Sequence, residues 1–474
     1  MQSRAGAAAL LAAVALSLAA LVATSGCSTN TNKQAPRHIT YWEKWTGFEG
    51  EAMDALIDDF NAKEVAHAKA DPNYAPIEVE KVTISKLEQK LLIAIAGGNP
   101  PDLAGNYSFC VASYADNGAL TDLGPLLAKA GFDRSRYIEH YMRLGEYRGK
   151  TWALPLAPAS TALLLNKRLF KEVGLDPERP PTTIEELDSY AEKLTKWEVT
   201  LPSGEKQIES GYLPQVPAAQ KRLLQAGFLP GEPTWFLYGW GDFFGGRLLD
   251  GPDKISTADP ANIRAFEWVA SYSKQLGVGV IKRFRSGFGN SSSPQSAFLS
   301  GKVAMTSQGV WMHNYIEKYA PGLQWAAVPF PYPAGHPELA GTTHAEADVL
   351  MIPKGSPHPE EAFAFMQYMS SQAALEKLCL AQQKFTPLSS VSDDFWLAHP
   401  NPYIRLFREL GMSKNAVAIP QTGIWNEYNR ELGNAIDLIQ NLKQPPAVAL
   451  ADVQTKMQAA LDRDRKILAR RQGQ

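Results

Sequence analysis

The sequence predicts a large α/β protein, on three observations. Its 474 residues correspond to about three average domains, or to two large lobes. Hydrophobic residues make up 45% of the chain and charged residues 20%, a globular composition with enough apolar side chains for a sizeable core. Stretches with strand-like alternation are followed by stretches with helical spacing, a pattern that favours a parallel-rich sheet covered by helices.

The first strand and helix units follow each other closely along the chain. Residues 38–42 predict a strand, and residues 51–60 carry apolar side chains at helical spacing. Residues 77–84 alternate like a strand, and residues 87–96 are again helical until the glycines and prolines of 97–101 end the helix.

A second series of strand and helix units begins with an apolar run at 151–165, which is followed by a predicted helix at 167–173. Thr183 is a candidate N-cap of the next helix, because Glu186 stands three residues later, the spacing of a capping box. The later predicted elements are a helix at 262–276, a Ser/Gly-rich loop at 286–294, and an amphipathic helix with Ala362, Phe365, Met366 and Met369 on its apolar face. No linker separates two independent domains.

The N-terminus has the pattern of a secretory signal. Arg4 precedes an apolar stretch from Ala5 to Ala23, which predicts a signal peptide over residues 1–26. The residues Thr24-Ser-Gly-Cys27 resemble a bacterial lipobox, although Thr24 replaces the usual aliphatic residue. The resemblance implies lipidation of Cys27, a tether over residues 27–36, and an exported protein anchored to a membrane at the periplasmic side or cell surface. An uncleaved anchor helix is the alternative.

Charge and cysteine content exclude several classes of protein. Lys and Arg total 47 against 49 Asp and Glu, so no basic field favours nucleic acid, and we expect no nucleic-acid partner. Cys110 and Cys379 are too few for a disulfide framework. Their apolar neighbours favour two buried, inert thiols over a single bridge.

Motifs of catalysis are missing or incomplete. The glycines of 145–151 have the wrong spacing for a phosphate loop, and those of 239–245 lack the last glycine of a dinucleotide fingerprint. His344-Ala-Glu346 begins like a zinc deaminase signature, but no Pro-Cys-x-x-Cys follows. We therefore expect no cofactor, no metal and no catalysis. A pair of glycosidase carboxylates leaves no such motif, so a secreted glycoside hydrolase stays an alternative.

Several tryptophans stand beside turn residues, where an indole ring is available to stack on a ligand. These are Trp45, Trp240, Trp311 and Trp425. By contrast, Trp197 and Trp268 are explained by core helices.

Short segments along nearly the whole chain resemble family 1 extracellular solute-binding proteins of ABC importers, the group that contains the maltodextrin-binding proteins. The matching segments include Ile-Thr-Tyr-Trp-Glu-Lys-Trp at 39–45, Ala-Gly-Gly-Asn-Pro-Pro-Asp-Leu at 96–103, Gly-Lys-Thr-Trp-Ala-Leu-Pro-Leu at 149–156, and Gly-Lys-Val-Ala-Met-Thr-Ser-Gln-Gly-Val-Trp at 301–311. The resemblance implies a two-lobed, type II periplasmic-binding-protein-like fold that closes on solute. Lobe one would be 37–150 plus 342–385, and lobe two 151–341 plus 386–474.

The resemblance also implies which residues line the cleft between the lobes. By position these are Glu43, Trp45, Thr46, Asn106, Tyr107, Ser160, Thr161, Trp311, Glu346, Asp348 and Trp425. Trp240 joins them only because of its place between glycines. At 159–161 the maltodextrin proteins have a carboxylate that this chain lacks, and Glu346 and Asp348 fit an inter-lobe salt bridge equally well.

These observations predict a monomeric, non-catalytic carbohydrate receptor that delivers its solute, an oligosaccharide, to the transmembrane subunits of an ABC permease. A binding protein for a non-sugar solute such as a glycerophosphodiester is an alternative. In that case Lys44, Arg247 and Arg285 would recognise phosphate.

Overall fold

The computed structural model describes residues 35–472. The predicted signal peptide, the lipidation candidate Cys27 and most of the predicted tether lie outside these residues. Among the described residues, no helix is both long enough and apolar enough to cross a membrane.

The chain divides into two compact units. In the smaller unit, which includes residues 61–78, the carboxylate of Glu64 accepts hydrogen bonds from the Tyr74 hydroxyl at 2.7 Å and from the Ile77 amide at 2.8 Å. The ring of His67 stacks on Tyr74 with centroids 3.9 Å apart. The larger unit, residues 39–60 and the chain from Val79 onward, holds every residue of the candidate site.

The strands of the structure are, in chain order, β1 Arg37–Glu43, β2 Ile77–Thr83, β3 Leu103–Tyr107, β4 Glu146–Tyr147, β5 Lys150–Thr151, β6 Ala153–Asn166, β7 Lys196–Thr200, β8 Lys206–Ser210, β9 Lys221–Gln225, β10 Met305–Gly309, β11 Trp325–Val328, β12 Thr343–Met351 and β13 Ala416–Val417. The helices of the first half are α2 Gly47–Ala70, α3 Leu87–Ala96, α4 Cys110–Asp116, α5 Gly124–Lys129, η1 Arg134–Arg136, α6 Glu139–Arg143, α7 Lys167–Glu172, α8 Ile184–Leu194 and η2 Leu237–Phe244. Those of the second half are α9 Pro260–Leu276, α10 Val278–Arg285, α11 Met312–Tyr319, η3 Pro337–Leu339, α12 Pro359–Met369, α13 Gln372–Ala381, α14 Asp393–Ala398, α15 Ile404–Gly411, α16 Trp425–Gln440 and α17 Pro446–Gln472.

The predicted α/β class is confirmed, but the sheet is mixed where a parallel-rich one was expected. Its strand order is β10, β6, β12, β3, β1, β2, with β11 beside β6 and β13 beside β12. β1 and β3 pair in parallel, whereas β12 is antiparallel to both β3 and β6. The prediction failed because strands that enter the sheet from separate parts of the chain need not follow the direction of a local strand–helix unit.

β6 connects two regions of the sheet. Its first half, up to Ser160, pairs with β12, and its second half, from Thr161, pairs with β10 and β11. Because side chains alternate across a strand, Leu163 packs into one large hydrophobic cluster and Leu164 into another. One apolar run in the sequence therefore supplies two cores.

Several local predictions are confirmed in detail. Thr183 caps α8, accepting a hydrogen bond from the Glu186 amide at 3.2 Å, and Glu186 accepts one from the Thr183 amide at 3.3 Å. Cys110 and Cys379 are buried and free. Trp197 is fully buried but lies in strand β7, so its expected place on a core helix was wrong.

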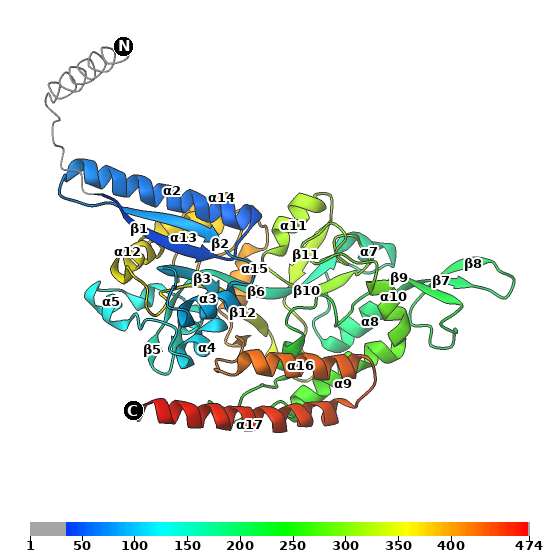
Figure 1. The fold of residues 1–474 in the computed structure, drawn as a ribbon. Coiled ribbons are helices and arrows are strands. Elements are labelled where there is room, and N and C mark those ends of the chain that lie inside the picture. The colour runs from blue at the N-terminus through cyan, green and yellow to red at the C-terminus, as the bar shows by residue number, and fades with distance from the viewer. Residues whose placement is uncertain (1–34, 473–474) are drawn as a thin grey trace, which may run out of the picture. The chain divides into compact units, whose positions relative to one another are not determined.

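Helices α9, α16 and α17 pack together, as Figure 1 shows in green, orange and red. The first turn of α16 carries Trp425, which is 2% exposed and packs edge-on against Tyr238 with centroids 5.1 Å apart. This packing holds α16 against η2 and positions both elements at the candidate site.

Candidate functional site

A cavity of about 600 Å³ lies where several strands of the sheet end. Trp45 follows β1, Tyr107 ends β3, and Trp311 follows β10. Ligand sites of α/β proteins commonly lie at the carboxyl ends of strands, and ligand cavities commonly measure about 300–1,000 Å³. The position and the size of this cavity therefore fit a site for a small molecule.

Aromatic rings dominate the cavity walls. Nine aromatic side chains line it: Trp45, Tyr107, Phe109, Trp235, Phe236, Tyr238, Trp311, Tyr315 and Trp425. Tyr107 is 42% exposed and Trp235 41% exposed, which is unusual for large apolar side chains. The rings of Trp235 and Trp311 stack with centroids 5.5 Å apart. Rings left open to solvent inside a cavity are suited to pack on the flat, apolar face of a ligand.

The polar groups of the walls come mainly from β12 and α16. Glu346 and Asp348 are two residues apart on β12 and therefore share one face of the strand. Asn426 and Asn429 lie three residues apart on α16 and share one face of that helix. The indole Nε1 of Trp311 is buried and has no hydrogen-bond partner within the described chain.

Asp348 joins two lysine ammonium groups at the cavity wall. Its carboxylate lies 2.8 Å from Nζ of Lys44 and 3.5 Å from Nζ of Lys384. Lys384 also donates to Glu49 at 2.7 Å, and Lys44 lies 3.5 Å from Glu43. Burial alone would raise the pKa of Asp348, but the two ammonium groups outweigh it and hold that pKa below its usual value.

These five residues form what we call the ion cluster: Glu43, Lys44, Glu49, Asp348 and Lys384. Nζ of Lys44 lies 4.8 Å from the ring centroid of Trp45 and 4.6 Å from that of Tyr107. Such cation–π contacts fix the two rings at the cavity edge. Because each lysine is matched by carboxylates, the cluster presents no free positive charge to a ligand.

The comparison with known proteins assigns the family. A family model described as bacterial extracellular solute-binding protein matches residues 55–401. The chain belongs to this family. The resemblance predicted the fold of the two-lobed periplasmic solute-binding proteins. The family match and the solved structures described next confirm this fold.

Solved structures align with this solute-binding protein over most of its length. CpMnBP1 with mannobiose bound is 27% identical, with a TM-score of 0.74, and the alignment covers 89% of this chain and 99% of that one. The GacH receptor of Streptomyces glaucescens, determined unliganded and with acarbose, is 20% identical with a TM-score of 0.64 over 90% of this chain and 99% of that one.

A curated relative matches a shorter region. The sn-glycerol-3-phosphate-binding periplasmic protein UgpB of Escherichia coli K12 is 30% identical over 178 residues. The match covers 36% of this chain and 38% of the relative.

The structure brings six of the twelve candidate residues together at the cavity of this solute-binding protein. The residues that line it are Trp45, Tyr107, Trp311, Glu346, Asp348 and Trp425. The other six lie outside the lining, namely Glu43, Thr46, Asn106, Ser160, Thr161 and Trp240.

Strand alternation explains part of this difference. Ala157 and Ala159 of β6 line the cavity, so Ser160 points to the opposite face and donates to the carbonyl of Phe407 at 2.6 Å. Asn106 likewise precedes the lining residue Tyr107, and its amide donates to the hydroxyl of Tyr114 at 3.0 Å.

Internal partners hold two more of these residues, and the third is exposed. Thr161 hydrogen-bonds through its amide to the hydroxyl of Thr343 at 3.0 Å. Glu43 is buried, and its carboxylate accepts hydrogen bonds from the Tyr41 hydroxyl and the Lys44 amide. Thr46 is exposed.

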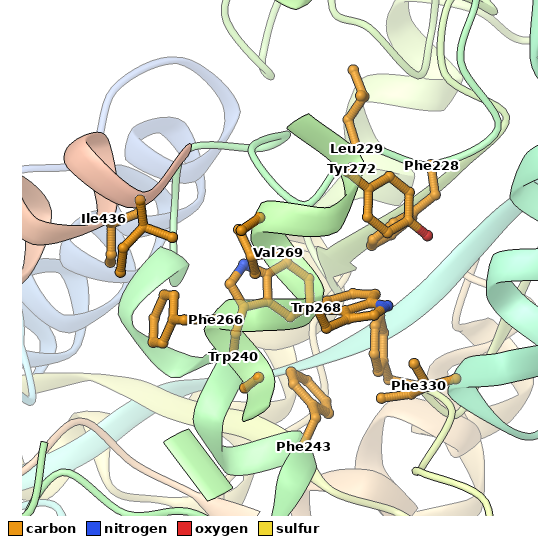
Figure 2. Packing of buried hydrophobic residues seen from close by; sticks show 14 of the residues in the cluster. Phe228, Leu229, Trp240, Phe243, Phe266, Trp268, Val269, Tyr272, Phe330 and Ile436 are labelled. Carbon is orange, nitrogen blue, oxygen red and sulfur yellow. The ribbon is translucent and has the colours of Figure 1, made fainter. Parts of the chain in front are cut away.

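Trp240 lies in the hydrophobic core, where Figure 2 shows it among Phe243, Trp268 and Phe330. Its Nε1 donates to the carbonyl of Pro230 at 3.1 Å. The glycines beside it do not mark an open loop. Gly239 allows close packing, because a Cβ there would lie 2.2 Å from Nε2 of His344.

Sequence reasoning missed the aromatic loop just before Trp240. Trp235, Phe236 and Tyr238 all line the cavity. Three aromatic residues within four positions, directly before a glycine, are the signal that points to this loop. The asparagines of α16 carried no comparable signal.

The position of the Trp311 ring depends on Gly309. A Cβ atom at Gly309 would lie 2.2 Å from two carbons of the indole, so Gly309→Ala must displace the ring. We expect this variant to bind solute about tenfold more weakly, a loss of about 1.4 kcal/mol. Calorimetric titration measures the affinity. Gly322→Ala, where a Cβ meets nothing within 4 Å, is the matched control, and equal affinities for the two variants would contradict a role for the ring.

Glu346 makes the stability of the protein depend on pH. Burial raises its pKa to about 7, although hydrogen bonds from the Ile419 amide and the Ser108 hydroxyl favour the charged form. Because the folded pKa exceeds the ordinary value of 4.5, the proton stabilises the folded state at low pH. This contribution is complete below pH 4.5 and is lost as pH rises through about 7.

Urea unfolding across this pH range tests the effect. The unfolding free energy of the unmodified protein should fall between about pH 5 and pH 8 relative to that of Glu346→Gln, which has no proton to lose. Two curves that stay parallel over this range would show that Glu346 does not titrate there.

Proposed function

We propose that this chain is the extracytoplasmic receptor of an ABC importer and that it holds a neutral oligosaccharide in the aromatic cavity. Family membership supports the receptor role. The sugar is supported by CpMnBP1, which is 27% identical in its mannobiose complex and 28% identical in its mannotriose complex. Sugar rings have apolar faces and polar edges, and the cavity offers indole and phenol rings together with amide and carboxylate groups.

The charge of the cavity is the observation that favours a neutral solute. Its lining contains three carboxyl groups, on Glu49, Glu346 and Asp348, of which Glu346 has a pKa raised to about 7, and one ammonium group, on Lys384. That ammonium group already bonds Glu49 and Asp348. A phosphate placed here would find no unpaired ammonium group among the lining residues.

The other cations considered for phosphate also have carboxylate partners. Nε of Arg285 lies 2.6 Å from Glu232, and Arg247 lies 3.6 Å from Asp242 and lines a different cavity. These pairings weigh against glycerol 3-phosphate, the ligand named for the partial relative UgpB.

Calorimetry with two classes of solute tests the proposal. Mannobiose, mannotriose and maltose form one class, and sn-glycerol 3-phosphate the other. We expect saturable binding of at least one saccharide with a micromolar dissociation constant, about −8 kcal/mol, and no binding of the phosphate. Trp311→Ala should weaken saccharide binding, whereas Arg247→Ala should not. Binding of the phosphate alone would overturn the proposal.

The receptor acts by binding and release, without chemical conversion. In this proposal lobe one is 37–150 plus 342–385, and lobe two is 151–341 plus 386–474. Solute shifts the receptor toward the closed form because it binds the closed form more tightly than the open form. Product analysis after prolonged incubation with the bound saccharide tests the absence of hydrolysis. A cleaved product that disappears in Glu346→Gln would instead support a glycoside hydrolase.

The remaining parts of the proposal concern location and partners. The receptor is exported as a monomer, is held at the membrane by lipid on Cys27, and delivers solute to the transmembrane subunits of a permease. Labelling of cells with an alkyne fatty acid should mark the protein, and Cys27→Ala should lose the label. A protein that stays unlabelled while it is exported would contradict the anchor.

A further inference from the structure

A second cavity adjoins the aromatic one, and we call it the annex. It also measures about 600 Å³, and the two cavities share Thr234 and Trp235 in their walls. The annex extends between the loop that contains Trp235 and the Ser/Gly-rich segment that follows α10. No part of the proposed function described so far uses it.

Trp235 stands at the boundary of the two cavities. One face of its ring stacks on Trp311 at 5.5 Å, a contact distance that leaves no room for a ligand ring between the two indoles. Its Nε1 donates to the hydroxyl of Ser291 at 2.9 Å, yet 41% of the side chain stays exposed. The exposed part of the indole is therefore available to a ligand that passes from one cavity to the other.

The Ser/Gly-rich segment ties the annex to the aromatic cavity. Ser291 lines the annex and accepts a hydrogen bond from Trp235, which lines both cavities. Asn290 in turn accepts hydrogen bonds from the amide and the hydroxyl of Ser292, at 3.1 and 3.0 Å. The segment that lines the annex thus holds a ring that lines both cavities.

The chemistry of the annex resembles that of the aromatic cavity. Its charged residues, Glu232 and Arg285, pair with each other at 2.6 Å and are 16% and 32% exposed. The other lining groups are the rings of Trp235 and Phe288, the amide of Asn290 and serine hydroxyls. A paired charge, two aromatic rings and several neutral hydrogen-bonding groups favour an uncharged polyhydroxyl ligand over an anion.

We propose that the annex is an extension of the solute site that binds further sugar units, so that the preferred solute is an oligosaccharide longer than a disaccharide. This inference rests on the proposed function. The first units lie in the aromatic cavity, and the chain continues past Trp235 into the annex. Each added unit buries more surface without a new cost of association, so affinity rises with chain length until the annex is filled.

Calorimetry with manno-oligosaccharides and malto-oligosaccharides, from disaccharide to hexasaccharide, tests the annex. We expect the best long saccharide to bind at least tenfold more tightly than the disaccharide of its series. Ser286→Trp places a large side chain in the annex, at an exposed residue outside the aromatic cavity. This variant should bind the disaccharide normally and lose the tenfold gain. Ser203→Trp, in an exposed turn between β7 and β8, is the matched control and should keep the gain.

The outcomes separate the annex from the proposed function. Equal affinity for all lengths, or a gain that survives in Ser286→Trp, would overturn the annex while leaving the receptor function in place. Binding of no saccharide would overturn the function itself. Asn290→Ala is a second variant, which removes a polar wall without adding bulk. It should reduce the gain with length and leave disaccharide affinity unchanged, and unaltered length dependence in both variants would count against the proposal.

Discussion

Trp425→Ala should lower the free energy of unfolding by about 3–5 kcal/mol and also weaken solute binding. Trp425 is 2% exposed, packs against Tyr238 and Tyr428, and lines the aromatic cavity. Its removal leaves a void between α16 and η2 and shifts the cavity wall to which the ring and its neighbour Tyr238 belong. The two losses have one structural cause, and they are measured by urea unfolding and by calorimetric titration with a saccharide.

A buried tryptophan outside the cavity separates stability from binding. Trp197 is fully buried in the same hydrophobic cluster as Trp425 but does not line the cavity. Trp197→Ala should therefore lose a similar amount of stability and keep its affinity. If folding of either alanine variant is incomplete, Trp425→Leu preserves more of the core and should still bind weakly. Normal affinity in Trp425→Leu would show that the indole does not shape the cavity wall.

Asp348→Asn should lower the free energy of unfolding by about 3–5 kcal/mol, because it leaves two buried ammonium groups with too few carboxylates. The side chains of Asp348, Lys44 and Lys384 are 13%, 7% and 5% exposed. Since the pKa of Asp348 is depressed in the folded state, its contribution is present above its ordinary pKa of 3.8 and is lost as pH falls below that value. Urea unfolding at neutral and acidic pH measures both effects.

An exposed ion pair provides the matched control. Asp250 and Lys254 lie 2.6 Å apart, but their side chains are 65% and 67% exposed. Asp250→Asn should change stability by less than about 1 kcal/mol. A similar small effect for Asp348→Asn would mean that the ion cluster is solvated and does not hold Trp45 and Tyr107 in place.

The sequence predicted the α/β class and the boundaries of many elements, because these depend on local patterns. The capping box of Thr183 and Glu186 is one example, and the continuous apolar run of β6 is another. Strand direction was not predictable in the same way. β12 runs antiparallel to β3 and β6 through contacts between residues far apart in sequence, and no local pattern encodes that choice.

In the candidate site, too, the sequence predicted some features and not others. The matching segments located the strands that border the cavity, but a resemblance between segments does not fix which of two adjacent side chains faces inward. This is why Tyr107 lines the cavity while its neighbour Asn106 bonds to Tyr114. Trp240 illustrates a further limit, since glycines that allow close packing look in the sequence like glycines of an open loop.

A crystal structure of the protein with its tightest-binding saccharide tests the central claim most directly. The account predicts electron density for sugar rings in the aromatic cavity, packed on the rings of Trp311 and of Tyr107, the latter 42% exposed. Saccharide bound away from these two rings, or a solute held chiefly by Lys44 and Lys384, would contradict it.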